Sequence, residues 1–268
     1  MRPEPGAALA DMLLPHALAA VGGGAPLVIG LTGPQGSGKT TVAERLRRRL
    51  GRQGLRAAVV GLDDLYLPRA ERPRLPLLDV RGVPGTHDAG LGARVLRHLK
   101  RPGAVLVPRF DKASDDRTSR WRRLVGPKDV ILFEGWCVGA RPQDEHALAV
   151  PVNDLERERD PDAVGRRFVN ERLRDDYAAL FSLIDFQVLL LAPDFDTVIR
   201  WRQEQEAGLR AATGRGMDDA AVADFVRHYE RLTRHMAREM PARSDVVVRL
   251  GPAREVIDVA TPARRPAD

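Results

Sequence analysis

The chain has 268 residues and a mass of 29.6 kDa, which is enough for a hydrophobic core that needs no disulfide or metal to staple it. Its 43% hydrophobic and 30% charged residues are typical of a folded soluble protein, and a single cysteine, Cys137, excludes an internal disulfide framework and a cysteine-based zinc site. Of 43 basic residues only four are lysines, and the net charge is +6. This excess fits an anionic small substrate, a nucleic-acid partner or simply a soluble surface, so the motifs must choose among them.

The first 24 residues are predicted to form a short amphipathic helix ahead of the main domain. Charged residues and a proline, among them Glu4, Asp11 and Pro15, interrupt the apolar run that a signal peptide needs. The longest uncharged stretch, residues 17–38, is broken by glycines and a proline, which argues against a membrane span. We therefore expect a cytoplasmic protein without a membrane partner, with one domain over residues 25–260 and a disordered tail over 261–268.

Six short apolar runs bounded by glycine, proline or charge predict strands. They cover residues 26–33, 56–64, 103–111, 129–135, 186–194 and 244–251. The runs are continuously apolar rather than alternating, which is typical of strands covered on both faces in a parallel sheet.

Helical patterns lie between these runs. Apolar residues recur every three or four positions along 42–50, 161–185, 194–212 and 218–238. Residues 65–90 are rich in proline, glycine and charge and predict a long loop, which in a small domain is usually functional. The alternation of strands and helices predicts an α/β fold with a mostly parallel central sheet flanked by helices.

The segment GPQGSGKT at residues 33–40 follows the first predicted strand and matches the phosphate-binding P-loop pattern. Its glycines, Gly33, Gly36 and Gly38, let backbone N–H groups converge on phosphate oxygens, and the helix that follows adds its positive end. Lys39 would reach the β- and γ-phosphates, and the Thr40 hydroxyl would reach Mg²⁺. A chance match in a chain of this composition is expected only about 0.002 times, so we predict an ATP and Mg²⁺ site.

Three carboxylates follow other buried strands at the edge where a ligand binds in open α/β sheets. Glu134 ends the run ILFEG and is the candidate to hold Mg²⁺ or its waters. Asp63 and Asp64 follow the second strand, and either one can accept a proton from a substrate hydroxyl.

The missing motifs narrow the class of P-loop protein. A GTPase would need Asn-Lys-x-Asp, but the two asparagines, Asn153 and Asn170, do not precede lysine, and no transporter ATPase signature is present. A phosphate loop, a carboxylate after the second strand and arginine-bearing lid helices together favour a small-molecule kinase.

Several motifs occur in an order that resembles the D-glycerate 3-kinase family, within the uridine- and pantothenate-kinase-like P-loop kinases. The motifs are GPQGSGKTT at 33–41, LDDLYLP at 62–68, RGVPGTHD at 81–88, VPRFDKA at 107–113, ILFEGWCVG at 131–139 and IRWRQEQE at 199–206. The resemblance covers about residues 26–240. It departs at Leu65, where the family usually has phenylalanine.

The resemblance implies transfer of the ATP γ-phosphoryl group to the 3-hydroxyl of D-glycerate. It places Asp63 as the general base, with Asp64 as the alternative, and Lys39 and one lid arginine as its catalytic partners. Arg200 and Arg202 do not share a helix face, and we favour Arg202. The nucleotide would be held by Gly33, Pro34, Gln35, Gly36, Ser37, Gly38, Lys39, Thr40 and Thr41.

The acceptor is expected to be a small glycerate-like anion, which needs a cation for its carboxylate and acceptors for its hydroxyls. The family motifs offer six residues for this site: Tyr66, Arg81, His87, Asp88, Arg109 and Lys112. Arg117 follows the same motif and is as readily a surface charge.

Two other functions stay open on the sequence. One is a kinase for another hydroxylated metabolite, such as pantothenate or a nucleoside. The other is a non-metabolic P-loop ATPase that binds nucleic acid, which the low aromatic content of 5% disfavours. The sequence does not indicate an oligomeric state.

Overall fold

The computed structural model describes residues 5–22, 24–112, 114–214 and 216–262. Most of the predicted disordered tail, residues 263–268, therefore lies outside the described residues.

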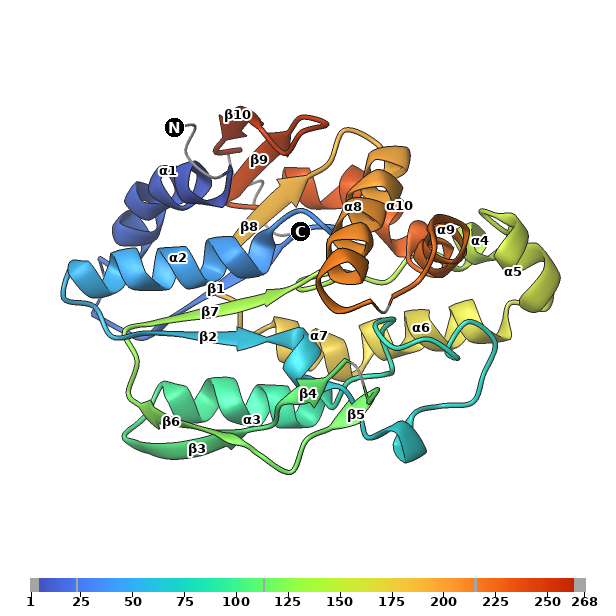
Figure 1. Ribbon diagram of the computed structural model, residues 1–268. Helices are drawn as coiled ribbons and strands as arrows, with labels where there is room; N and C mark the ends of the chain where they lie inside the picture. Colours follow the sequence, from blue (N-terminus) through green and yellow to red (C-terminus); the bar gives the residue numbers. More distant parts are fainter. Residues whose placement is uncertain (1–4, 23, 113, 215, 263–268) are drawn as a thin grey trace.

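A six-stranded sheet in the order β10–β9–β8–β1–β7–β2 forms the centre of the molecule (Figure 1). Its strands are β1 Leu27–Thr32, β2 Ala57–Gly61, β7 Val130–Gly135, β8 Phe186–Leu191, β9 Val246–Leu250 and β10 Val256–Ala260. All neighbours run parallel except β10, which pairs antiparallel with β9 at the edge. The predicted α/β fold of the P-loop kinases, with a mostly parallel sheet, is confirmed.

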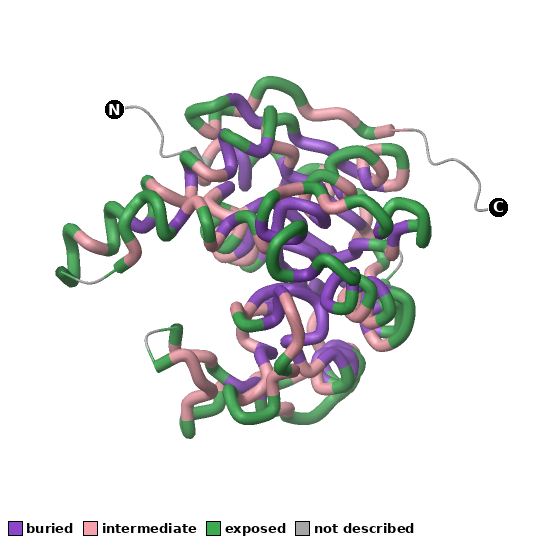
Figure 2. The backbone as a smooth tube through the Cα atoms, turned by 90° about the vertical axis from the view of Figure 1, so that its right-hand side faces the viewer, coloured by how far each residue is buried: buried purple, intermediate pink, exposed green. Residues whose placement is uncertain are grey.

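The strands are apolar on both faces because helices cover both. Ile29 and Leu132 face the cluster formed with α1 Pro5–Ala20 and α2 Lys39–Arg52, whereas their neighbours Val28 and Ile131 face the opposite cluster. That second cluster includes α3 Ala89–Leu99, α7 Asp176–Phe181 and α10 Glu230–Glu239. In Figure 2 the buried segments accordingly gather at the centre of the molecule. The N-terminal helix contributes fully buried side chains to the first cluster and so packs as part of the domain.

One predicted strand, 103–111, does not join this sheet. Residues Gly103–Val107 form β3, which pairs antiparallel with β6 Arg122–Gly126 in a separate two-stranded sheet beside α3. Because one face of β3 is open to solvent, Ala104 and Leu106 are exposed, a pattern that an apolar run alone does not reveal. A second small hairpin, β4 Phe110–Asp111 with β5 Asp116–Arg117, follows it.

Two predicted helices are each divided. The helix expected over 161–185 starts only at Val164 and breaks at Asp175, giving α6 Val164–Arg174 and α7. The helix expected over 218–238 divides into α9 Asp219–Arg227 and α10, with Tyr229 at the junction. Apolar periodicity continues across both breaks, so the pattern could not locate them.

The other predicted segments are confirmed. Residues 194–212 form α8, Phe195–Thr213, whose first turn is capped by Asp194. The loop predicted over 65–90 ends where α3 begins at Ala89, and before that point it contains the short 3₁₀ turns η1 Leu62–Leu65, which joins it to β2, and η2 Arg69–Glu71. Three further short elements, α4 Glu145–Ala149, α5 Asp154–Arg159 and η3 Met240–Ala242, had no signal in the sequence. No helix in the described part of the chain combines the length and apolar character that crossing a bilayer requires, and the cytoplasmic location stays a prediction.

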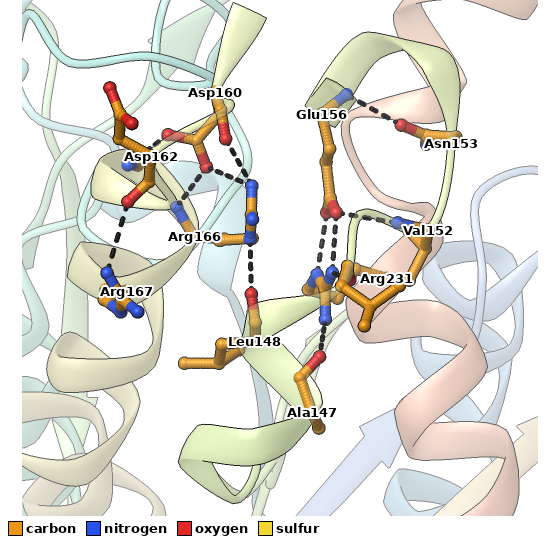
Figure 3. Close-up of polar contacts among 12 residues, drawn as sticks. Ala147, Leu148, Val152, Asn153, Glu156, Asp160, Asp162, Arg166, Arg167 and Arg231 are labelled. Atoms are coloured by element: carbon orange, nitrogen blue, oxygen red, sulfur yellow. Dashed lines mark hydrogen bonds and ion pairs between the residues drawn. The ribbon is translucent and has the colours of Figure 1, made fainter. Parts of the chain in front are cut away.

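Buried arginines join the helices on one side of the sheet (Figure 3). Arg231 of α10 makes two bonds to the Glu156 carboxylate, at 2.7 and 2.6 Å, and donates to the carbonyls of Ala147 and Val150. Arg166 binds the Asp160 carboxylate at 3.2 Å, with both side chains almost fully buried. In each pair, both the arginine and its carboxylate partner are buried. Removal of one partner therefore leaves the other charge buried and unpaired.

We predict that Arg231→Ala lowers the free energy of unfolding by about 3–5 kcal/mol, because Glu156 then stays buried without its cation. Arg227→Ala is the matched control, since Arg227 is exposed and its loss is expected to change stability by no more than about 0.5 kcal/mol. Denaturant unfolding of both variants measures the difference. Equal changes would show that the Arg231–Glu156 pair is not a structural ion pair.

Candidate active site

The P-loop joins β1 to α2 in the backbone shape that phosphate binding requires. Gly36 and Gly38 have φ angles of 74° and 83°, in the left-handed region that favours glycine. A Cβ on Gly36 would also lie 2.7 Å from the Cβ of Trp201. Gly33 serves a different purpose from the one predicted: its φ is not left-handed, and a Cβ there would lie 2.9 Å from Leu190, so it permits close packing on β8.

Thr40 and Glu134 meet at the start of α2. The Thr40 hydroxyl donates to Glu134 Oε1 at 3.0 Å, and the Glu134 side chain is 6% exposed. A Cβ on Gly61 would lie 3.5 Å from Glu134 Oε1 and 3.6 Å from Asp64 Oδ2, so both carboxylates lie beside the end of β2. Hydroxyl and carboxylate oxygens are the donors that Mg²⁺ prefers, and these residues fit that ion.

The same group is not a metal site made of protein alone. Within the described residues, no three His, Cys, Asp or Glu side chains lie close enough to hold an ion by themselves. Mg²⁺ in phosphoryl-transfer sites is usually held by one or two protein oxygens together with waters and phosphate oxygens. Thr40 and Glu134 agree with that arrangement.

Asp63 lies at the end of β2 and forms an ion pair with Lys112. Lys112 Nζ donates to Asp63 Oδ2 at 2.7 Å, and the Tyr66 hydroxyl donates to Oδ1 at 2.8 Å. Burial raises the pKa of Asp63, but the charges of Lys112 and Lys39 outweigh it and hold the pKa well below its usual range. Asp63 is therefore ionised and accepts hydrogen bonds at neutral pH.

Asp64 has different neighbours. Its Oδ2 lies 3.8 Å from the Arg122 guanidinium, and burial raises its pKa. Of the two candidate bases, Asp63 is the one that faces Lys112, Tyr66 and the charge of Lys39.

A stack of aromatic rings lines one side of Asp63. The Tyr66 ring stacks on His87 with 4.5 Å between centroids and meets the edge of Phe110 at 4.8 Å. His87 is 3% exposed, and its Nδ1 lies 2.6 Å from the Tyr177 hydroxyl. That hydroxyl also accepts from the Gly85 N–H, and we expect its own proton to point to Nδ1, which places the His87 proton on Nε2.

His87 Nε2 is buried and has no hydrogen-bond partner among the residues described. An unpaired buried donor is costly, which points to a ligand that completes it. Burial lowers the pKa of His87 to about 4, so the ring is neutral at physiological pH.

Arg81 and Arg72 both bind Asp115 on the β4–β5 hairpin. Arg81 reaches Asp115 Oδ1 at 2.6 Å and Arg72 reaches Oδ2 at 2.7 Å, and both guanidinium groups lie within 6.0 Å of the Phe110 ring centre. The hairpin that carries Lys112 is thereby fixed to the long loop. Arg109, just before the hairpin, is exposed.

Asp88 and Arg117 have structural partners. Asp88 caps α3 by accepting from the Leu91 N–H at 2.8 Å, and Arg117 lies 3.6 Å from it. Arg117 Nε donates to the Tyr66 carbonyl at 2.6 Å. The structure therefore uses Asp88 as a helix cap, although it adjoins His87 in the predicted acceptor group.

Comparison with known proteins agrees with this geometry. A Schizosaccharomyces pombe protein described as uncharacterized kinase mug58 is 36% identical over 223 residues, which cover 77% of this chain and 79% of that protein. The chloroplastic D-glycerate 3-kinase of Arabidopsis thaliana is 35% identical over 221 residues, 76% of this chain but 46% of the plant protein. The structure of D-glycerate 3-kinase from Cryptococcus neoformans superposes with a TM-score of 0.79 at 25% identity, covering 95% of this chain and 99% of that one.

The chain belongs to the D-glycerate 3-kinase family. It is an ATP-dependent phosphotransferase that acts on an alcohol group. The family description "Methylmalonyl Co-A mutase-associated GTPase MeaB" also matches, but only over residues 3–66, which hold the P-loop common to both groups. The kinase has no Asn-Lys-x-Asp motif, so this partial match does not extend to guanine recognition.

The two lid arginines of the kinase have different partners, as expected from their i, i+2 spacing. Arg200 donates to Thr197 Oγ1 of its own helix at 2.6 Å. Arg202 lies 2.5 Å from Glu206 Oε2 and 5.8 Å from the Phe225 ring centre, and its charge acts on Tyr229. Arg202 is therefore the arginine that approaches α9 and Tyr229, and its role in the reaction stays a prediction.

Tyr229, at the break between α9 and α10, was missed by the sequence reasoning. Its hydroxyl donates to the Arg81 carbonyl at 2.5 Å, and its ring meets the edge of Trp136 at 4.9 Å. Burial raises the pKa of Tyr229, and the nearby Gln35 of the P-loop acts in the opposite direction. Trp136 in turn donates to the Gly82 carbonyl at 2.7 Å, so its ring packs between Tyr229 and the long loop. No local motif marks Tyr229, because its role depends on contacts with three distant segments.

A cavity of about 330 Å³ lies behind the P-loop of the kinase, between β8, α8 and α10. Thr32, Gly33 and Pro34 line part of it, and the rest is lined by residues of β8, α8 and α10 together with Trp136, both apolar and charged. Its lining does not include Asp63, Lys112 or Glu134, so it is separate from the candidate acceptor and metal residues.

His87 provides a test of this geometry by pH titration. Because burial depresses its pKa to about 4, we expect the ring to stay neutral from pH 8 down to about pH 5.5 and to protonate only near pH 4. Nitrogen-15 NMR of the histidine rings, assigned with His87→Gln, should report a neutral ring with the proton on Nε2. A titration midpoint between 6 and 7, or a proton on Nδ1, would contradict the Tyr177 hydrogen bond.

Proposed function

We propose that this kinase transfers the γ-phosphoryl group of ATP to the 3-hydroxyl of D-glycerate, giving 3-phosphoglycerate. One observation carries the proposal: the ionised Asp63 is paired with Lys112 beside the P-loop, so a hydroxyl acceptor and a carboxylate site adjoin each other. A hydroxy acid presents those two groups. The relatives named D-glycerate 3-kinase support the same acceptor.

The nucleotide is assigned to the P-loop and the metal to the residues next to it. ATP phosphates are held by Gly33, Pro34, Gln35, Gly36, Ser37, Gly38, Lys39, Thr40 and Thr41. Thr40 and Glu134 hold Mg²⁺, which when bound neutralises part of the phosphate charge. Lys39 adds its ammonium group to the same charge, and Arg202 approaches from the lid.

Lys112 links the two halves of the acceptor site. It is 63% exposed and free to exchange Asp63 for a substrate carboxylate, with Arg109 and Arg81 as further cations on the same side. When Lys112 moves to the carboxylate, its effect on Asp63 weakens and the proton affinity of Asp63 rises. The base is thereby strengthened at the moment that the acceptor hydroxyl is in place.

The aromatic stack orients the acceptor. The buried Nε2–H of His87 donates to an acceptor oxygen, and Tyr66 holds the Asp63 carboxylate in position. Asp88 contributes by capping α3, which fixes the backbone that carries His87. The reaction then depends on alignment and charge neutralisation, as in other phosphoryl transfers.

A panel of acceptors tests the substrate. The purified kinase is incubated with ATP, Mg²⁺ and D-glycerate, L-glycerate, pantothenate or uridine, and phosphorus-31 NMR identifies the product. We expect turnover with D-glycerate and a 3-phosphate product. Turnover with pantothenate or uridine but not with glycerate would overturn the acceptor while leaving the kinase assignment in place.

Asp63→Asn tests the base. We expect kcat to fall about 10²- to 10⁴-fold, because the amide cannot accept the proton, while affinity for an ATP analogue stays unchanged. Asp224→Asn is the control, since Asp224 is exposed on α9. Undiminished turnover in Asp63→Asn would exclude Asp63 as the base and direct the search to Asp64.

A further inference from the structure

Arg254 connects three segments of the kinase that are far apart in sequence. It lies in the turn between β9 and β10, and its Nε donates to the carbonyl of Gly36 in the P-loop at 2.7 Å. The same guanidinium reaches Glu204 Oε2 at 2.6 Å and the Trp201 carbonyl at 3.3 Å, both on α8. It also lies over the Trp201 ring, 5.2 Å from its centre.

Trp201 contacts both the β9–β10 turn and the P-loop. It is fully buried, its Nε1–H donates to the Pro252 carbonyl of the turn at 2.7 Å, and its Cβ lies against the Cα of Gly36 closely enough to exclude any side chain there. The turn, the lid helix and the P-loop therefore contact one another pairwise. A shift of α8 cannot leave Gly36 unaffected, because interiors packed this closely transmit displacement.

The backbone of Arg254 is held in an unfavourable conformation. Its φ is 64°, in the left-handed region, which costs a non-glycine residue of order 1–3 kcal/mol. The turn fixes this conformation through two bonds, Gly251 N–H to the Glu255 carbonyl at 2.8 Å and Arg254 N–H to the Gly251 carbonyl at 2.9 Å. A glycine or asparagine would adopt this φ at lower cost, and the side-chain contacts of Arg254 offset that cost.

We propose that Arg254 is a positioning residue for phosphoryl transfer: it sets the P-loop carbonyl at Gly36 against the lid helix and so couples the placement of α8 to the nucleotide site. Arg202 follows Trp201 directly on that helix, so the same contact determines how the lid arginine is presented. The planar fork of arginine can satisfy three acceptors in three directions, whereas a lysine ammonium on its flexible stem does not reproduce this geometry. The inference rests on ATP-dependent phosphoryl transfer and is independent of which acceptor is used.

The test compares Arg254→Ala and Arg254→Lys with Arg249→Ala. Arg249 is the matched control, because it lies in the same hairpin and is exposed. Its ion pair with Asp258 is long, at 3.7 Å. Affinity for a non-hydrolysable ATP analogue is measured by calorimetry without acceptor, and KM for ATP and for the acceptor are measured separately. Loss of charge-assisted hydrogen bonds to the P-loop predicts about 10- to 100-fold weaker nucleotide binding in Arg254→Ala, with KM for the acceptor unchanged.

Two additional measurements separate positioning from mere stability. Methylguanidinium added to Arg254→Ala should restore part of the nucleotide affinity, and Arg254→Lys should restore less than half of the lost binding free energy. Glu204→Gln keeps the bond to Gly36 and should weaken nucleotide binding less than Arg254→Ala does. Wild-type nucleotide affinity in Arg254→Ala, or equal losses in both KM values together with a lowered melting temperature and no rescue, would overturn the proposal.

These readouts do not depend on the acceptor. If no glycerate is phosphorylated by the wild-type protein, the calorimetric affinities still report on Arg254. Failure of the proposed acceptor and failure of the proposed role for Arg254 are therefore distinct results.

Discussion

Hydrogen bonds from arginine side chains to backbone carbonyls hold the irregular segments of this kinase in place. Arg117 binds the Tyr66 carbonyl, Arg243 binds Gly139 and Arg254 binds Gly36. Carbonyls in loops have no strand or helix partner, and a buried carbonyl without a donor is costly. A guanidinium group supplies several donors in one plane, so one side chain can satisfy a loop carbonyl and a carboxylate together. The excess of arginine in the sequence is thus partly structural.

The acceptor side of the candidate active site depends on these contacts because its residues lie on segments outside the sheet. Asp63 follows β2, Lys112 is on the short β4–β5 hairpin, and His87 ends the long loop. Arg117 ties the hairpin to the segment after Asp63, while Arg81 and Arg72 tie the long loop to Asp115 of the hairpin. The alignment of acceptor and phosphate that phosphoryl transfer needs is therefore maintained by ion pairs and carbonyl bonds around the reacting groups.

The sequence predicted the parts of the structure that local chemistry determines. The P-loop, its preceding strand, Glu134 at the end of β7 and Asp63 after β2 were placed by motif and strand order, because carboxyl ends of parallel strands share one edge. The run 103–111 was misassigned because apolar content does not distinguish a strand buried on both faces from one half exposed. Tyr229 and Arg254 could not be found at all, since their partners lie 148 and 218 residues away.

Lysine and arginine near the candidate site differ in how many partners each side chain binds at once. Arginine, with its planar fork, fixes loops by several simultaneous bonds and is poorly suited to release a partner. Among the described residues, Lys112 donates one side-chain hydrogen bond, to Asp63, and its side chain is 63% exposed, so solvent and ligands can compete for that contact. An acid acceptor needs a cation that can leave Asp63 without disturbing the loops that arginine holds. Under the proposed mechanism, a lysine at position 112 meets this requirement, whereas an arginine would hold Asp63 through several bonds at once.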